Sequence, residues 1–334
     1  MARMDKINSR AKPEINTGFG INANNYGGRF INKNGRANIE KKGIGFLEKI
    51  SWYHTMLLLP RWKFFLIIVL FYVCINLIFA TIYLLIGVQS LGEIPSPSTL
   101  TNFAESFFFS TQTFTTVGYG RISPIGFLSS SVAAFEALLG LLSFALATGL
   151  LYGRFSKPVA YVRFSHNALI APYKETNALM FRLVPFKNTN LVDAVVSVTL
   201  GMTLEENGVR VNRFYQLDLE FSTVNALTLS WTVVHPINEK SPFYNFTKND
   251  FENMTGEVVV SVRAFDDMFS NIVVARTSYV FGEIYYGGKF EPMFERDNSG
   301  EKTVIYIDKL NSFKPTDLNA APTGEEIPID EIVI

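Results

Sequence analysis

The sequence predicts a membrane protein in two parts: a pair of spanning helices with a short helix between them, then an all-β domain. Two apolar runs, 64–86 and 127–152, are each long enough to cross about 30 Å of hydrocarbon. A helical segment between them, 102–114, is too short to cross. From residue 159 onward, apolar residues recur at every second position, which is typical of strands.

The composition argues against several other classes of protein. Of the 334 residues, 48% are hydrophobic, and 30 basic side chains balance 30 acidic ones. A net charge near zero gives no reason to expect a nucleic-acid partner. The single cysteine, Cys74, lies in an apolar run, so no disulfide framework is expected. The first apolar run starts too late and is too long for a cleavable signal peptide.

The first segment, 1–45, is polar and glycine-rich, and we expect it to be mostly irregular and cytoplasmic. Within it, 29–31 and 37–39 flank a turn-like sequence and are suited to pair as short strands.

An amphipathic helix is predicted over 46–60. Phe46, Ile50, Tyr53 and Leu57 recur at spacings of three and four, and Pro60 ends the pattern. Such a helix either lies in the membrane interface with its apolar face down or packs on protein.

Charges beside the apolar runs predict the orientation. The basic residues that precede the first run or follow the second are Lys41, Lys42, Lys49, Arg61, Lys63, Arg154, Lys157 and Arg163. The loop between the runs carries only Glu93, Glu105 and Arg121. By the positive-inside bias, both termini are cytoplasmic, and the chain is a multi-pass protein of the cell (inner) membrane.

The short helix 102–114 follows Pro95 and Pro97, and Asn102 and Glu105 are suited to cap its start. A segment of this length is re-entrant, which a membrane tolerates where protein buries it. Its C-terminal end carries partial negative charge and favours a cation.

The segment 115–120 follows this helix and reads Thr115-Thr116-Val117-Gly118-Tyr119-Gly120. Potassium-selective pores replace the water shell of the ion with backbone carbonyls of such a segment. The glycines can take backbone angles that turn successive carbonyls inward. The Thr116 hydroxyl can add an oxygen, while Val117 and Tyr119 point away and brace the loop. The alternative is a glycine-rich turn, which the flanking helices argue against.

One such segment supplies carbonyl oxygens on one side of the ion, so four chains must surround the ion to complete the ring. The segment 116–120 is therefore the expected selectivity filter. K⁺ at its carbonyls is the only metal expected, with no other cofactor. His54, His166 and His235 lack metal-ligand spacing, and no nucleophile–base pair or phosphate loop is apparent. We expect no catalysis.

The part from 159 to 313 is predicted to be a β-sandwich, and 314–334 a loose tail. The alternating runs are Tyr215, Leu217, Leu219 and Phe221; Leu227, Leu229, Trp231 and Val233; and the segments 194–200, 257–262, 277–285 and 303–307.

Several motifs carry a family resemblance. They are Phe107-Phe108-Phe109-Ser110 leading to Gly120, Tyr152-Gly153-Arg154-Phe155-Ser156-Lys157-Pro158, Phe164-Ser165-His166-Asn167-Ala168, Ser230-Trp231-Thr232-Val233-Val234-His235-Pro236-Ile237, and Arg29-Phe30 with Gly35-Arg36-Ala37-Asn38. The chain resembles the inward-rectifier potassium channel (Kir) family, particularly its bacterial branch (KirBac), with some eukaryotic features, over roughly 29–312.

The resemblance implies a homotetramer whose pore domain, 61–158, stands above an immunoglobulin-like cytoplasmic sandwich. It also implies that the amphipathic helix before the first span is an interfacial slide helix.

Positions near the filter depart from the family. Eukaryotic members pair a Glu behind the filter with an Arg after it, whereas the neighbourhoods here read Gln112 and Arg121, so that pair is expected to be absent as such. Glu136 in the second span either supplies the missing charge or is a buried, protonated carboxyl. Thr115, Gln112, Arg121 and Glu136 are thus candidates for filter support.

The inner helix holds the candidate cavity and gate. Phe144, Thr148 and Tyr152 share one face. Phe144 stands where many family members place an acid that binds intracellular Mg²⁺ or polyamines, so weak rectification is expected. Tyr152 either forms a ring of phenols that closes the pore or anchors the helix at the interface. Gly140 and Gly149 are possible hinges or packing points.

Basic residues at the inner membrane face are candidates for binding lipid. In the family such residues bind headgroups of anionic lipids, including phosphoinositides; here the cluster is Arg61, Trp62, Lys63, Arg154 and Lys157. Positive-inside topology alone also explains these charges.

The two rival hypotheses are weaker. A pore gated by a cytoplasmic nucleotide or calcium domain needs alternating helices and strands, which the period-two pattern argues against. A membrane-anchored β-sandwich interaction module leaves the re-entrant helix and the filter without purpose.

Overall fold

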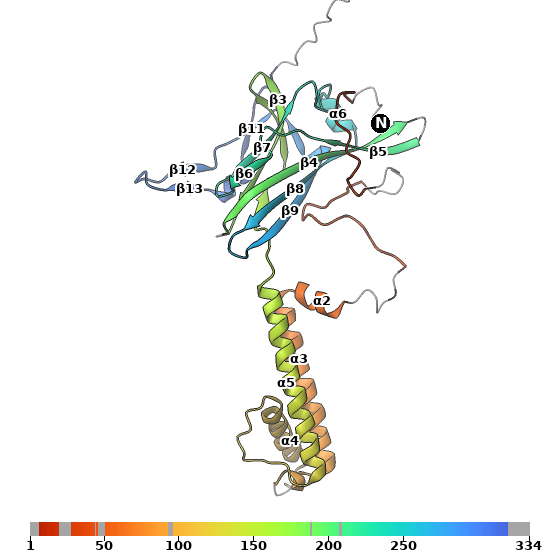
Figure 1. Cartoon of the computed structure of the whole chain (residues 1–334), viewed down its shortest axis with the longest axis vertical. Helices are drawn as coiled ribbons and strands as arrows, with labels where there is room; N and C mark the ends of the chain where they lie inside the picture. The colour runs from red at the N-terminus through yellow and green to blue at the C-terminus, as the bar shows by residue number, and fades with distance from the viewer. Residues whose placement is uncertain are drawn as a thin grey trace, which may run out of the picture. The chain divides into compact units, whose positions relative to one another are not determined.

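The computed structural model describes residues 7–19, 28–43, 45, 51–92, 96–187, 189–206 and 209–319. The chain divides into two compact units, Lys41–Lys157 and a second made of Met1–Glu40 with Pro158–Ile334. Figure 1 shows the elements of both. Each unit is described by itself.

The first unit is helical. It contains α2 (Trp52–Leu58), α3 (Arg61–Ile86), the short 3-10 helix η3 (Val88–Leu91), α4 (Thr99–Phe114) and α5 (Phe127–Phe155). The 26 residues of α3 and the 29 of α5 are long and apolar enough to span a membrane. Of the predicted amphipathic helix, 46–50 lies outside the described residues, and α2 is its described part.

The helix α4 packs against both α3 and α5 (Figure 1). A small apolar core joins the three helices and includes Phe79 and Tyr83 of α3, Phe109 of α4 and Ala133 of α5. A helix of this length beside two spanning helices is the predicted re-entrant arrangement.

The start of α4 differs from the predicted one. The helix begins at Thr99, because the Ser98 hydroxyl accepts a hydrogen bond from the amide of Thr101 at 3.5 Å. Asn102 instead closes the preceding loop through bonds to the amide and carbonyl of Ser96 at 2.8 and 3.0 Å. The predicted capping role of Asn102 and Glu105 is therefore wrong, since Glu105 pairs with Arg121.

The second unit is a sandwich of two sheets. The first sheet has the order β1-β3-β2-β10 with β7 beside β3, and the second has the order β5-β4-β8-β9 with β6 beside β4. The strands of the first are β1 (Val162–Phe164), β2 (Ala168–Tyr173), β3 (Thr176–Pro185), β7 (Trp231–Ile237) and β10 (Ile284–Tyr286). Those of the second are β4 (Leu191–Glu206), β5 (Val209–Gln216), β6 (Thr223–Ala226), β8 (Gly256–Asp266) and β9 (Asn271–Val280).

Shorter elements complete this unit. They are α6 (Lys248–Asn253), η4 (Phe281–Glu283), η5 (Ile307–Asn311) and two strand pairs, β11 (Gly288–Phe290) with β14 (Phe313–Pro315) and β12 (Phe294–Arg296) with β13 (Thr303–Ile305).

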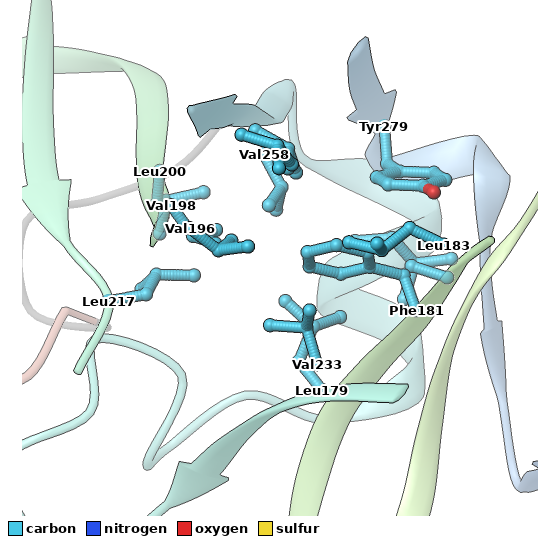
Figure 2. Close-up of a cluster of buried hydrophobic side chains, with 14 of the residues drawn as sticks. Leu179, Phe181, Leu183, Val196, Val198, Leu200, Leu217, Val233, Val258 and Tyr279 are labelled. Carbon is cyan, nitrogen blue, oxygen red and sulfur yellow. The ribbon is translucent and has the colours of Figure 1, made fainter. Parts of the chain in front are cut away.

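The core lies between the two sheets. Figure 2 shows Phe181 of β3 and Val233 of β7 with Val198 of β4 and Val258 of β8 in one buried cluster. Inward-facing residues alternate with outward-facing ones along these strands, which is the pattern that predicted a sandwich. The predicted fold class, with two spans and an all-β domain, is confirmed.

Two predicted strand segments are not strands. Residues 217–222 leave the second sheet: the amide of Leu217 bonds the carbonyl of Val198 at 3.0 Å, and that of Glu220 bonds the carbonyl of Val234 in β7 at 2.9 Å. This segment crosses between the sheets, so it cannot pair along either. Residues 227–230 likewise form a connection, and the strand there begins at Trp231.

The N-terminal segment packs on the β unit. A single bridge pairs Ile31 with Ala37, as the predicted short hairpin requires. The side chain of Glu257 in β8 accepts hydrogen bonds from the amides of Phe30 and Ile31, the latter at 3.0 Å. Arg29 contacts Glu283 at 2.5 Å. This part of the segment is therefore held by specific polar contacts.

Candidate functional site

The filter segment alternates between two backbone conformations. Thr116, Gly118 and Gly120 have positive φ angles of 60°, 53° and 80°, whereas Val117 and Tyr119 do not. Alternation of this kind turns successive carbonyls to the same side of the chain. No heavy atom lies within 4 Å of the position that a Cβ would take at Gly118 or Gly120. Glycine is therefore favoured there by the left-handed conformation and not by crowding within the chain.

The end of α4 anchors this segment. The carbonyl of Gln112 accepts hydrogen bonds from the amides of Val117 at 3.0 Å and Gly118 at 3.3 Å, and the amide of Thr116 donates to Thr113 at 3.0 Å. The Thr115 hydroxyl donates to the carbonyl of Thr111 at 2.7 Å. Gln112 and Thr115, both predicted to support the filter, thus contact it or the helix end directly, Gln112 through its backbone.

Two side chains of the segment are exposed in the part of the single chain that the structure describes. Val117 is 53% exposed and Tyr119 is 79% exposed. Side chains of this size in a membrane-spanning unit are normally covered by protein or lipid.

Gly140 of α5 lies against the last residue of α4. A Cβ at Gly140 would stand 1.9 Å from the carbonyl oxygen of Phe114, closer than any real contact. Gly149, by contrast, has no heavy atom within 4 Å of that position. Of the two readings given for Gly140, the structure supports close packing; Gly149 is free of such a constraint.

Glu136 is fully buried one turn before Gly140. Its carboxyl oxygens contact the hydroxyls of Tyr83 on α3 at 2.7 Å and Ser110 on α4 at 2.5 Å. Ser110 also contacts Asn76 on α3 at 2.9 Å. These contacts join all three helices through buried side chains.

Arg121 has an acidic partner. It pairs with Glu105 on α4. Glu105 lies seven residues before Gln112, two helical turns from the position where the family places its acid, so this is a different pair from the one of the eukaryotic members. Glu136 contacts two hydroxyls and is not the partner of Arg121.

Phe144, Thr148 and Tyr152 are all exposed in the single chain, at positions four residues apart on α5. A cavity of about 850 Å³ opens beside Phe144. The cavity is lined by Thr115 and Thr116 at the inner end of the filter segment, by Leu141 and Leu150 of α5, and by Met56 of α2. The inner face of α5 is thus continuous with the inner end of the filter.

Arg154 is placed differently from the other basic residues of the predicted lipid cluster. Its guanidinium donates to the carbonyls of Met56 at 3.2 Å and Leu59 at 2.5 Å, at the C-terminal end of α2, and stands 5.1 Å from the centre of the buried Phe64 ring. Arg154 therefore bonds α2 to the end of α5. Arg61, Trp62, Lys63 and Lys157 are exposed.

Sequence reasoning missed Asn76, Tyr83 and Ser110. A signal existed: Asn76 and Tyr83 are polar groups in an apolar run and lie seven residues apart, on one helix face. Their partners on other helices gave no such local signal.

The sequence matches two family models. One, described as inward rectifier potassium channel C-terminal domain, matches residues 162–325, and the other, described as ion channel, matches residues 65–157.

Relatives match both parts of the chain. Inward rectifier potassium channel Kirbac3.1 of Paramagnetospirillum magnetotacticum is 34% identical over 281 residues, which cover 83% of this chain and 92% of that protein. G protein-activated inward rectifier potassium channel 4 of Mus musculus is 28% identical over 312 residues, which cover 86% of this chain and 72% of that protein. The same channel of Bos taurus matches with the same identity and coverage.

Proposed function

The chain belongs to the inward rectifier potassium channel family, and from this premise we propose that four copies surround one axis and conduct K⁺ passively through 116–120. It is a membrane protein and an ion channel, not an enzyme. The transported K⁺ is the only ion the filter needs, and no cofactor takes part.

The observation that carries this proposal is the alternation of left-handed residues at Thr116, Gly118 and Gly120. Carbonyls turned to one side supply oxygens only from that side, so a complete ring around a dehydrated ion needs copies of the chain. The exposure of Val117 and Tyr119 in the single chain agrees with contacts to neighbouring copies.

Cation flux into liposomes tests the proposal. Purified protein is expected to take up Rb⁺ and K⁺ far faster than Na⁺, with block by Ba²⁺. Gly118→Ala is the matched inactive variant, because its φ of 53° is unfavourable for alanine. Comparable Na⁺ and Rb⁺ fluxes through assembled wild-type protein contradict the assignment.

The gate proposed here is the ring of four Tyr152 side chains at the cytoplasmic end of α5, with bending at Gly149. The exposure of Tyr152 and the open space beside Gly149 support it. Tyr152→Ala is expected to raise Rb⁺ flux, and unchanged flux places the gate elsewhere.

Weak rectification is proposed from Phe144, whose ring offers no negative charge to intracellular Mg²⁺ or polyamines. Phe144→Asp is expected to strengthen polyamine block of outward current, since four carboxylates facing one cavity concentrate negative potential. Strong wild-type block that this variant leaves unchanged assigns the blocker to another site.

Anionic lipids, including phosphoinositides, are proposed to modulate gating through Arg61, Trp62, Lys63 and Lys157 at the inner membrane face. The channel is proposed to lie in the inner membrane of the cell, with both termini in the cytoplasm. A lipid shifts gating only by binding the open and closed states differently. Lys157→Gln is expected to weaken the flux response to phosphoinositide without changing selectivity. Arg154→Lys, which loses the forked contact with α2, is expected to change basal flux also in liposomes without phosphoinositide.

A further inference from the structure

A chain of polar side chains runs through the buried interior of the helical unit. It passes from Tyr83 to Glu136, from Glu136 to Ser110 and from Ser110 to Asn76, with oxygen–oxygen distances of 2.7, 2.5 and 2.9 Å. All four residues are 0% exposed. Buried oxygens this close must share a hydrogen, because two facing lone pairs repel at low dielectric.

The orientation of Asn76 is settled by its other contact. Its side-chain nitrogen lies 2.7 Å from the carbonyl oxygen of Tyr72, which can only accept. The amide oxygen therefore faces Ser110, and Asn76 donates no hydrogen to that contact.

Counting hydrogens then determines the state of the acid. Three pairs of oxygens need three hydrogens, and the two hydroxyls of Tyr83 and Ser110 supply one each. The third must be on the carboxyl of Glu136. In the one assignment that satisfies every contact, Tyr83 donates to Glu136, Glu136 donates to Ser110, and Ser110 donates to Asn76.

We propose that Glu136 is a neutral carboxylic acid in this directed chain, and that Tyr83, Glu136, Ser110 and Asn76 together are positioning residues for the filter. The role in positioning rests on the proposed potassium-selective function, whereas the protonation state does not. A neutral acid also fits its partners, which are uncharged hydroxyls in a unit where an isolated charge is costly.

The path from this chain to the filter is short. Ser110 lies two residues before Gln112, whose carbonyl holds the amides of Val117 and Gly118. Four residues further along each helix, Gly140 of α5 meets Phe114 of α4. The two contacts, Glu136 with Ser110 and Gly140 with Phe114, set both the rotation and the depth of the C-terminal half of α4.

The proposal distinguishes Glu136→Gln from other changes. A glutamine can accept from Tyr83 through its oxygen and donate to Ser110 through its nitrogen, so it keeps the direction of the chain. Ser110→Ala and Tyr83→Phe each remove one hydroxyl. Ser131→Ala is the matched control, because Ser131 is an exposed helical serine of α5 bonded only to its own turn, at the carbonyl of Phe127.

The first measurement is the ratio of Rb⁺ to Na⁺ uptake by full-length tetramers in liposomes. Glu136→Gln and Ser131→Ala are expected to keep the wild-type ratio within about twofold. Ser110→Ala is expected to lower the ratio roughly tenfold, because the conformation that selects Rb⁺ loses about the free energy of one buried hydrogen bond. Collapse of the ratio in Glu136→Gln, or a wild-type ratio in Ser110→Ala, overturns the positioning role.

The second measurement is independent of conduction. Infrared spectra of the protein at neutral pH should contain the carbonyl band of a protonated carboxylic acid that disappears in Glu136→Gln. If no such band is lost, Glu136 is ionised and the proposal is wrong. If wild-type protein passes Na⁺ as readily as Rb⁺, the proposed function fails, and the infrared result still decides the state of Glu136.

Discussion

Among the described residues, each unit of the chain buries one glutamate almost completely, and the two glutamates have opposite surroundings. Glu257 in the β unit is 1% exposed and faces donors only: the amides of Phe30 and Ile31, with Arg29 Nε 3.9 Å away. Glu136 in the helical unit is 0% exposed and faces two hydroxyls, one of which has another acceptor to satisfy. The difference teaches that donor supply, and not burial alone, decides whether a buried acid can carry charge.

The comparison is tested most strongly by making the same change at both sites. Glu257→Gln turns an amide N–H toward backbone donors and removes one of the two carboxylates near Arg29, the other being Glu283. We expect the free energy of unfolding of the β unit to fall by about 3 kcal/mol. Glu136→Gln, which can keep both contacts, should change stability by less than about 1 kcal/mol.

Denaturant titration of full-length protein in detergent, followed by circular dichroism of strands and helices, measures both. Equal losses of unfolding free energy in Glu257→Gln and Glu136→Gln contradict the distinction between a charged and a neutral acid.

His235 extends the comparison to a base. It is 3% exposed; its Nδ1 lies 2.6 Å from the carbonyl oxygen of Asp218 and its Nε2 lies 2.8 Å from the Ser241 hydroxyl. Burial lowers the pKa of His235 from 6.5 to about 4. Because the folded pKa is the lower one, this contribution to stability is full above pH 6.5 and is lost as the pH falls toward 4. From pH 7 to pH 5 we expect a loss of about 2 kcal/mol.

Unfolding at several pH values checks this, with His235→Gln expected to flatten the dependence in that window. His166→Gln is the control, because His166 is exposed. An unchanged slope in His235→Gln assigns the acid sensitivity to other groups.

The third prediction concerns the packing that holds Glu136 near Ser110. Gly140→Ala places a methyl group against the Phe114 carbonyl and should force α5 away from α4, at a cost of roughly 1 to 3 kcal/mol and with a reduced Rb⁺ to Na⁺ ratio. Among the described residues, no heavy atom lies within 4 Å of the methyl group that Gly149→Ala adds, so this change should leave the ratio unchanged. Thermal unfolding in detergent measures the loss of stability, and ion uptake measures the Rb⁺ to Na⁺ ratio. If Gly149→Ala alone lowers the ratio, Gly149 is the packing position and Gly140 is the hinge.

Local patterns predicted most of the architecture. The apolar runs that became α3 and α5, the short α4 and the alternating residues of β4 and β8 need only hydropathy and period to be recognised. Alternation misled at 217–221, where Leu217 is buried but the backbone crosses between sheets, since side-chain pattern does not report hydrogen-bond partners. The helix start at Thr99 was missed because Ser98 and Asn102 are both capable caps, and the loop fold chooses between them.

The sequence by itself determined the two spans, the all-β domain and the family, and it predicted the filter segment, because each is encoded by neighbouring residues. Only the tertiary structure decided which side chains meet. The guanidinium of Arg154, a candidate for binding lipid, donates to the carbonyls of Met56 and Leu59, and Arg121 pairs with Glu105 rather than with an acid at position 112. The contacts of Glu136 with Ser110 and of Ser110 with Asn76 support the neutral carboxyl that we propose for Glu136. A hydrogen bond depends on distance and on the supply of donors in three dimensions, and residues 34 positions apart such as Asn76 and Ser110 carry no sign of it in their order along the chain.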